Sequence, residues 1–87
     1  MVGTIYTLNI FRRAQKGLSN LDEGSYIRVR DAIRALARDH RPVGSKRLTG
    51  RPGWRVRVGF YRVIYEVDDV NHVITIMHVG HRRDVYR

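Results

Sequence analysis

The stretch WRVRVGFYRVIY, residues 54–65, is typical of a β-hairpin. Apolar and basic residues alternate on both sides of Gly59-Phe60, and alternation with a period of two indicates strands with one buried and one open face. A glycine at the first central position suits a two-residue type II′ turn, which requires a positive φ there. This turn would place Arg57 directly opposite Arg62.

The same alternation predicts a basic face on the hairpin, formed by Arg55, Arg57 and Arg62. Like charges directly opposite one another weaken a sheet. We therefore expect a chain that keeps such a pair to use it on an anion. The opposite face is expected to enter the core, with these apolar residues: Trp54, Val56, Val58, Tyr61, Val63 and Tyr65.

The charge of the chain supports an anionic partner. Its 87 residues include 17 Lys and Arg against 8 Asp and Glu, which gives a formal net charge of +9. Nearly all of the cations are arginine, whose planar fork binds two phosphate oxygens at once and stacks on bases. Nucleic acid, an acidic protein or both would explain this composition. A membrane surface is less favoured, because the charges are not confined to one amphipathic helix.

Length and composition indicate a single domain over residues 1–87. The absence of cysteine rules out disulfides and thiolate metal sites and fits a reducing compartment. There is neither an apolar run of membrane-spanning length nor a signal-peptide pattern. We therefore expect a cytoplasmic protein that does not enter a membrane.

The predicted fold class is α+β, in the order β-α-α-β-β-β, with a small, mainly antiparallel sheet and two helices packed on one face. A strand is expected at 4–8 and a short helix, capped by Asn9, at 10–18. Asp22 is the expected N-cap of a longer helix that runs to about Asp39. On the first helix, inward-facing residues are expected at Phe11, Ala14 and Leu18, and on the second at Tyr26, Val29, Ile33, Leu36 and Ala37. A polar loop is expected at 43–53. The last strand, at 72–79, is apolar on both faces and is therefore expected to be central or covered on both sides.

Two segments carry a resemblance to a known family: KRLTGRPGWRVRVGFYRVIYEVDD at 46–69 and ITIMHVGHRRDVYR at 74–87. Together with the two-helix N-terminal half, the chain resembles the RelE branch of the RelE/ParE toxin superfamily over nearly its whole length. The most specific pieces are the K-x-L-x-G loop at 46–50, YRVIYEVDD at 61–69 and the VGHR…VY ending at 79–86.

The resemblance implies the toxin of a type II toxin–antitoxin system. Such a toxin would enter the A site of the 70S ribosome and cut the mRNA, by attack of a ribose 2′-OH on the adjacent phosphate. It would need no cofactor or metal. The catalytic set implied by the family's motifs is Arg55, Arg57, Arg62, Arg82 and Tyr86, with further RNA contacts expected from Lys46, Arg47, Arg51 and Arg83.

The general base is the open question in this resemblance. The best-known relatives have lysine where this chain has Arg55 and Arg57, and one of those lysines is proposed as the base. Arginine stays protonated, so it is a poor base but a good stabiliser of a charged transition state. We hypothesise that His81 moves the proton, or that the ribosome or the RNA itself assists.

The family also implies a RelB-like antitoxin, small and acidic, and binding of operator DNA only through the complex of the two. Two alternatives remain open. One is a ParE-like inhibitor of DNA gyrase without nuclease activity. The other is a non-catalytic nucleic-acid-binding module held mainly by phosphate contacts.

Other notable residues have ordinary interpretations. Arginines on the longer helix (Arg28, Arg30, Arg34 and Arg38) are expected to be solvated charges. His72 and His78 are expected to be structural, and the spacing of the histidines does not match a known metal site.

Overall fold

Two helices and a five-stranded sheet make up the part of the chain that the structure, a computed structural model, describes: residues 4–81 and 83. The sheet order is β1-β5-β4-β3-β2, with β1 parallel to β5 and every other pair antiparallel. The α+β prediction is confirmed. The elements are β1 (Thr7–Ile10), α1 (Arg12–Ser19), α2 (Glu23–Leu36), β2 (Lys46–Arg47), β3 (Trp54–Val58), β4 (Tyr61–Asp68) and β5 (Val73–His81).

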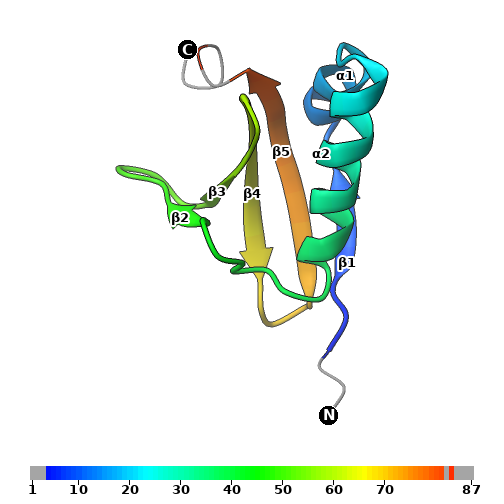
Figure 1. The fold of residues 1–87 in the computed structure, drawn as a ribbon. Helices are drawn as coiled ribbons and strands as arrows, with labels where there is room; N and C mark the ends of the chain where they lie inside the picture. Colours follow the sequence, from blue (N-terminus) through cyan, green and yellow to red (C-terminus); the bar gives the residue numbers. More distant parts are fainter. Residues whose placement is uncertain (1–3, 82, 84–87) are drawn as a thin grey trace.

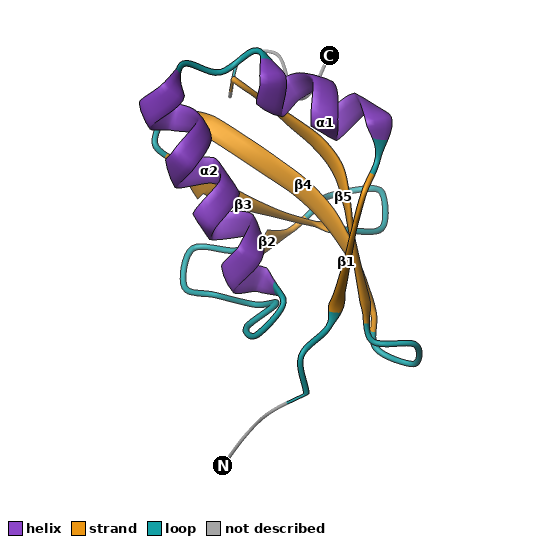
Figure 2. Cartoon of the chain, turned by 90° about the vertical axis from the view of Figure 1, so that its right-hand side faces the viewer, coloured by secondary structure: helices purple, strands orange, loops and turns teal. Residues whose placement is uncertain are grey.

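Both helices cover the same face of the sheet, as expected, and leave the other face open (Figures 1 and 2). The core lies between these two layers, where Tyr65 is the largest fully buried side chain. The apolar face predicted for the hairpin enters this core: Val56, Val63 and Tyr65 are buried, and Trp54, Val58 and Tyr61 pack against them. Neither helix of the described residues has the length and apolar content needed to span a lipid bilayer.

The hairpin has the predicted register. Val58 pairs with Tyr61 and Arg57 pairs with Arg62 across β3 and β4. Gly59 has a φ of +60°, and His72 is the only described non-glycine residue with a positive φ. A positive φ at the first central position alone is the signature of a type II′ turn.

The β4–β5 pair contains a β-bulge that the sequence did not predict. Ile64 pairs with His78, but the next residue, Tyr65, pairs with Ile76, so that Met77 is the extra residue on β5. Ile76 and Val79 are both buried in the core beneath the helices. The two residues between them, Met77 and His78, therefore both belong to the open face.

The N-terminal elements lie further along the chain than expected. The first strand covers residues 7–10 instead of 4–8, and α1 begins after Phe11 instead of at Asn9. The backbone N–H of Phe11 donates to the carbonyl of Ile76, which continues the β1–β5 ladder and delays the helix. Phe11 was expected to point inward, but it is 44% exposed.

The N-cap of α2 is confirmed, since the Asp22 carboxylate accepts from the backbone N–H of Ser25. The helix ends at Leu36, earlier than predicted, because its last turn tightens into bonds of the i to i−3 type and the Ala37 carbonyl accepts from Tyr6 of the N-terminal segment. Tyr26 was expected to be buried and is 38% exposed.

A short strand, β2, lies within the segment that was predicted to be only a polar loop. Lys46 pairs with Arg55 and Arg47 with Trp54. Two residues without apolar alternation carry no strand signal, so β2 depends on the partner that β3 provides.

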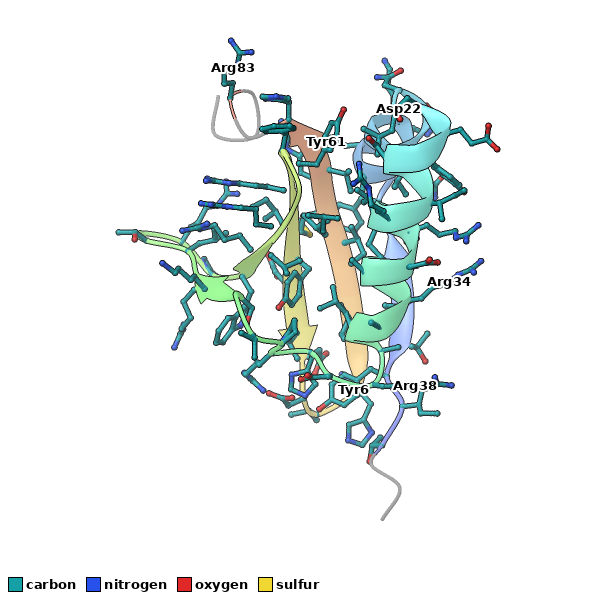
Figure 3. All side chains as sticks on the ribbon, in the orientation of Figure 1. Tyr6, Asp22, Arg34, Arg38, Tyr61 and Arg83 are labelled. Atoms are coloured by element: carbon teal, nitrogen blue, oxygen red, sulfur yellow. The ribbon has the colours of Figure 1, made fainter. Side chains whose placement is uncertain are left out.

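The end of the sheet opposite the hairpin turn is tied together by Asp69. Its carboxylate accepts from the hydroxyl of Tyr6 at 2.6 Å and from the guanidinium of Arg41 at 3.3 Å, and the His40 ring lies 3.8 Å away. Figure 3 shows Tyr6 at this end. The hydrogen bond from Tyr6 and that from Arg41 lower the pKa of Asp69. These contacts join the N-terminal segment and the α2–β2 segment to the β4–β5 turn.

Substitution of Gly17 by alanine is expected to destabilise the fold, because a Cβ at this position would overlap the Val79 carbonyl oxygen of β5. Overpacking of this kind costs about 1–3 kcal/mol. Gly24→Ala is the matched control, since its Cβ would meet only the Asp22 carboxylate at 3.6 Å, and alanine favours the helix by up to about 1 kcal/mol. Urea unfolding should separate the two variants; equal stability would contradict the close packing of α1 on β5.

Substitution of Asp69 by asparagine is expected to lower the thermal midpoint at pH 7. Because folding lowers the pKa of Asp69, its stabilisation is present above the unfolded pKa of about 3.9 and is lost as the pH falls through the folded value. The difference between wild type and variant should therefore shrink in acid. Asp31→Asn, which removes only the exposed pair with Arg30, is the control. Parallel pH profiles for wild type and Asp69→Asn would contradict this role.

Candidate functional site

A groove of about 990 Å³ lies on the open face of the sheet. Its floor comes from β3, β4 and β5, one side from the segment between β2 and β3, and the other from the start of α1. Figure 3 shows nitrogen-tipped side chains projecting on this side, away from the helices. Among the described residues, the basic ones that line the groove are Arg13, Lys46, Arg47, Arg51, Arg55 and Arg62, and the one acidic residue is Glu66.

The strand register arranges the floor of the groove in two neighbouring rows. One row crosses the sheet through Lys46, Arg55, Ile64 and His78. The row beside it crosses through Arg57, Arg62 and Gly80. Since Gly80 carries no side chain, β5 contributes only backbone to this row beside Arg62.

The positive charges of Arg55 and Arg57 are available to a ligand. Arg55 and Arg62 are half-buried, and Arg57 is exposed nearer to the turn. Within residues 4–81 and 83, neither Arg55 nor Arg57 forms an ion pair with a carboxylate. Positive groups gathered in a concave site focus the field and attract anions.

The groove also has an apolar component. Ile64, only 2% exposed, and Met77 contribute to the floor, while Leu48 and Pro52 line the side formed by the β2–β3 segment. Phe11 lines the groove from the start of α1, and its exposed ring is accessible for stacking. Apolar surface between arginines suits a ligand that has both phosphates and flat bases.

Most of the basic residues singled out from the sequence come together here. Arg55 and Arg62 line the groove with Lys46, Arg47 and Arg51, and Arg57 lies directly opposite Arg62. The Arg47 guanidinium also lies 5.8 Å from the centre of the Trp54 ring, and that of Arg41 lies 5.1 Å from it. Arg47 therefore has a structural contact in addition to its place in the groove.

His81 lies apart from the arginines. It pairs with Tyr61 at the end of β5, on the side that the helices cover, and its ring contacts the rings of Tyr61 and Phe60. Arg83 donates its backbone N–H to the His81 ring, and its side chain points away from the sheet (Figure 3). Arg82 and Tyr86 lie outside the described residues.

The residues of the groove that sequence reasoning did not assign to a site include Phe11, Arg13, Met77 and His78. Phe11 and Arg13 reach the groove because β1 pairs with β5 and directs the start of α1 there. Met77 and His78 depend on the bulge, which an apolar segment such as HVITIMHV does not reveal. Among the described residues, no three His, Asp or Glu side chains are grouped so that they could hold a metal ion.

Comparison with known proteins places the chain among toxins. The family model described as the ParE toxin of type II toxin-antitoxin systems, parDE, matches residues 8–86. The toxin–antitoxin complex RelBE2 of Mycobacterium tuberculosis contains a similar chain, with 27% identity, a TM-score of 0.78, and coverage of 90% of this chain and 99% of that one.

Two further solved structures are similar. The archaeal RelE–RelB complex of Pyrococcus horikoshii has a chain with 28% identity and a TM-score of 0.80, covering 93% of this chain and 99% of that one. The isolated E. coli RelE toxin shares the fold, with 24% identity, a TM-score of 0.76, and coverage of 93% and 90%. The comparison with curated proteins gave no significant match.

The groove is expected to bind single-stranded polyanions through its arginines. Arg55→Gln should weaken binding of a single-stranded oligonucleotide and reduce the slope of log affinity against log salt by roughly 1. Arg34→Gln is the matched control, since Arg34 is exposed on α2 and points away from the sheet (Figure 3). Fluorescence anisotropy at several salt concentrations measures both. Equal salt slopes for the two variants would contradict the groove as the binding site.

Proposed function

The chain belongs to the RelE/ParE superfamily of type II toxins, and from this premise we propose that it is a ribosome-dependent endoribonuclease that cleaves mRNA in the A site. The observation that carries the proposal is the groove, in which arginines from neighbouring strands surround an apolar floor on the open face of the sheet. This combination suits an RNA strand, which offers a phosphate to the arginines and bases to the apolar surface.

The arginines would act on the scissile phosphate by electrostatics. Arg55, Arg57 and Arg62 would hold the phosphate and stabilise the charge that develops when the 2′-oxygen attacks phosphorus. Arg82 would stabilise the leaving 5′-oxygen, and Tyr86 would orient or stack the RNA; both lie outside the described residues. The cleaved strand would carry a cyclic phosphate on one side and a free 5′-OH on the other.

The proposal includes an acidic antitoxin as the partner. The similar toxin chains of M. tuberculosis and P. horikoshii are in complexes with antitoxins. A chain with a net charge of +9 and an open basic groove would be neutralised by an acidic partner that covers the groove. With its basic surface covered by the antitoxin, the toxin would not contact operator DNA by itself. Operator binding would then be a property of the toxin–antitoxin complex.

A second candidate function is inhibition of DNA gyrase, as in ParE-type toxins. It is favoured by the ParE family model, which matches residues 8–86. Such a toxin would act by binding, with no need for a phosphate next to the paired arginines. A groove that serves only non-catalytic RNA binding would give affinity without cleavage. The assay below separates these functions.

Arg62→Ala is expected to lower the rate of A-site cleavage by at least about 100-fold, which is the usual cost of removing one preorganised charge stabiliser. Purified ribosomes programmed with a defined mRNA, followed by primer extension, provide the measurement. Arg34→Ala should cleave at the wild-type rate. Circular dichroism should show that both variants are folded.

Each other outcome would contradict the proposal. Full cleavage by Arg62→Ala would remove this residue from the site. A wild-type protein that inhibits gyrase supercoiling and leaves the mRNA intact would establish the second candidate. Binding of RNA with neither cleavage nor gyrase inhibition would indicate the non-catalytic module.

A further inference from the structure

The bulge between β4 and β5 places on the open face the one histidine among the described residues that line the groove. Without the extra residue, β5 would alternate strictly between the core and the open face. With it, both Met77 and His78 lie between the buried residues Ile76 and Val79 and belong to the open face. Bulges recur next to active sites, where they redirect a side chain. His78 is half-buried and lines the groove.

His78 lies close to the paired arginines. It is opposite Ile64, in the row of Arg55, and two residues from Gly80, which is opposite Arg62. His78 is therefore the diagonal neighbour of Arg62. Residues at diagonal positions have Cα atoms about 7–8 Å apart, a distance that one nucleotide can span. The other charged groups among the described residues that line the groove are Arg13, Lys46, Arg47, Arg51 and Glu66.

Phosphate cleavage by a 2′-OH requires a group that accepts a proton. Arginine stays protonated at working pH, so none of the arginines in the groove can serve, and Lys46 would first have to lose its own proton. Among the described residues of the lining, the titratable side chains that can accept a proton near neutrality are His78 and Glu66. Imidazole ordinarily titrates at about pH 6.5 and glutamate at about 4.3, so imidazole is the better matched base near neutrality.

We propose that His78 is the general base of the cleavage reaction, an inference that rests on the proposed endoribonuclease function. Its neutral imidazole takes the proton of the ribose 2′-OH while the 2′-oxygen forms a bond to phosphorus. The bond from phosphorus to the 5′-oxygen breaks, and that oxygen takes a proton from water. The imidazolium then returns its proton to solvent, which completes the balance without an oxidant, a reductant or a metal.

This assignment differs from the His81 hypothesis in geometry. The His81 ring packs against Tyr61 on the helix-covered side, so a phosphate held by Arg62 would lie on the other side of the sheet. His78 shares the face of Arg62 and the groove itself. The two assignments of the base therefore predict different results in the same assay.

The test compares single-turnover cleavage by wild type, His78→Gln and His81→Gln on saturating, mRNA-programmed ribosomes across roughly pH 5.5–8.5, a range that brackets the ordinary imidazole pKa. His78→Gln should lower the cleavage rate by about 10²–10⁴-fold. It should also abolish the decrease in cleavage rate that wild type shows as the pH is lowered. His72→Asn, which changes a histidine in the distant β4–β5 turn, is the matched control and should behave as wild type. Added imidazole should restore cleavage by His78→Ala.

Two further measurements exclude a purely structural effect. The thermal midpoint of His78→Gln and its affinity for programmed ribosomes with a 2′-deoxy residue at the cleavage site should match those of wild type. A lower value of either would indicate a packing or binding role and overturn the proposal. The proposal would also be overturned if the decrease in cleavage rate at low pH disappears only in His81→Gln.

The remaining outcomes separate this inference from the function on which it rests. If wild type cleaves and His78→Gln cleaves at the same rate, the His78 assignment is wrong and the endoribonuclease stands. If the rate falls in His78→Gln but its decrease at low pH is the same as in wild type, His78 positions the RNA and is not the base. If wild type does not cleave, the endoribonuclease and the base assignment are both wrong.

Discussion

The strict alternation of the β3–β4 hairpin is the constraint on which the rest of the structure depends. It directs Val56, Val63 and Tyr65 into the core and Arg62 to the open face. A slip of one residue would exchange the two faces and expose the core to water, while placing arginines beneath the helices. Burial of the apolar side chains therefore holds the arginines side by side, in spite of their mutual repulsion.

The parts of the fold that could be predicted are those encoded by neighbouring residues. Gly59 specifies the turn and Asp22 specifies the start of α2, and both are confirmed. The parts that were missed depend on distant partners. β2 exists because β3 provides its hydrogen bonds, and Phe11 leaves the core because its backbone bonds to β5. No local pattern in the sequence encodes either interaction.

The candidate site was also predictable only where neighbouring residues encode it. Period-two alternation was sufficient to gather Arg55, Arg57 and Arg62, because it acts within one hairpin. The groove around them required the β2–β3 segment, the start of α1 and the bulge at Met77 to be placed in three dimensions. His78 was interpreted as structural because the apolar run around it gives no sign of which face it joins.

The two ends of the sheet differ in their balance of charge. Around Asp69 the charges are matched, since a carboxylate accepts from Tyr6 and Arg41. Among the described residues that line the groove, six are basic and one is acidic, and this imbalance opposes folding through self-repulsion. Local conflicts of this kind concentrate at functional sites, where binding of an anion removes the repulsion. By linkage, a ligand that binds only the folded chain raises its stability. If RNA and an acidic partner both bind this groove, as proposed, the same excess charge would favour both, and the two would compete for one surface.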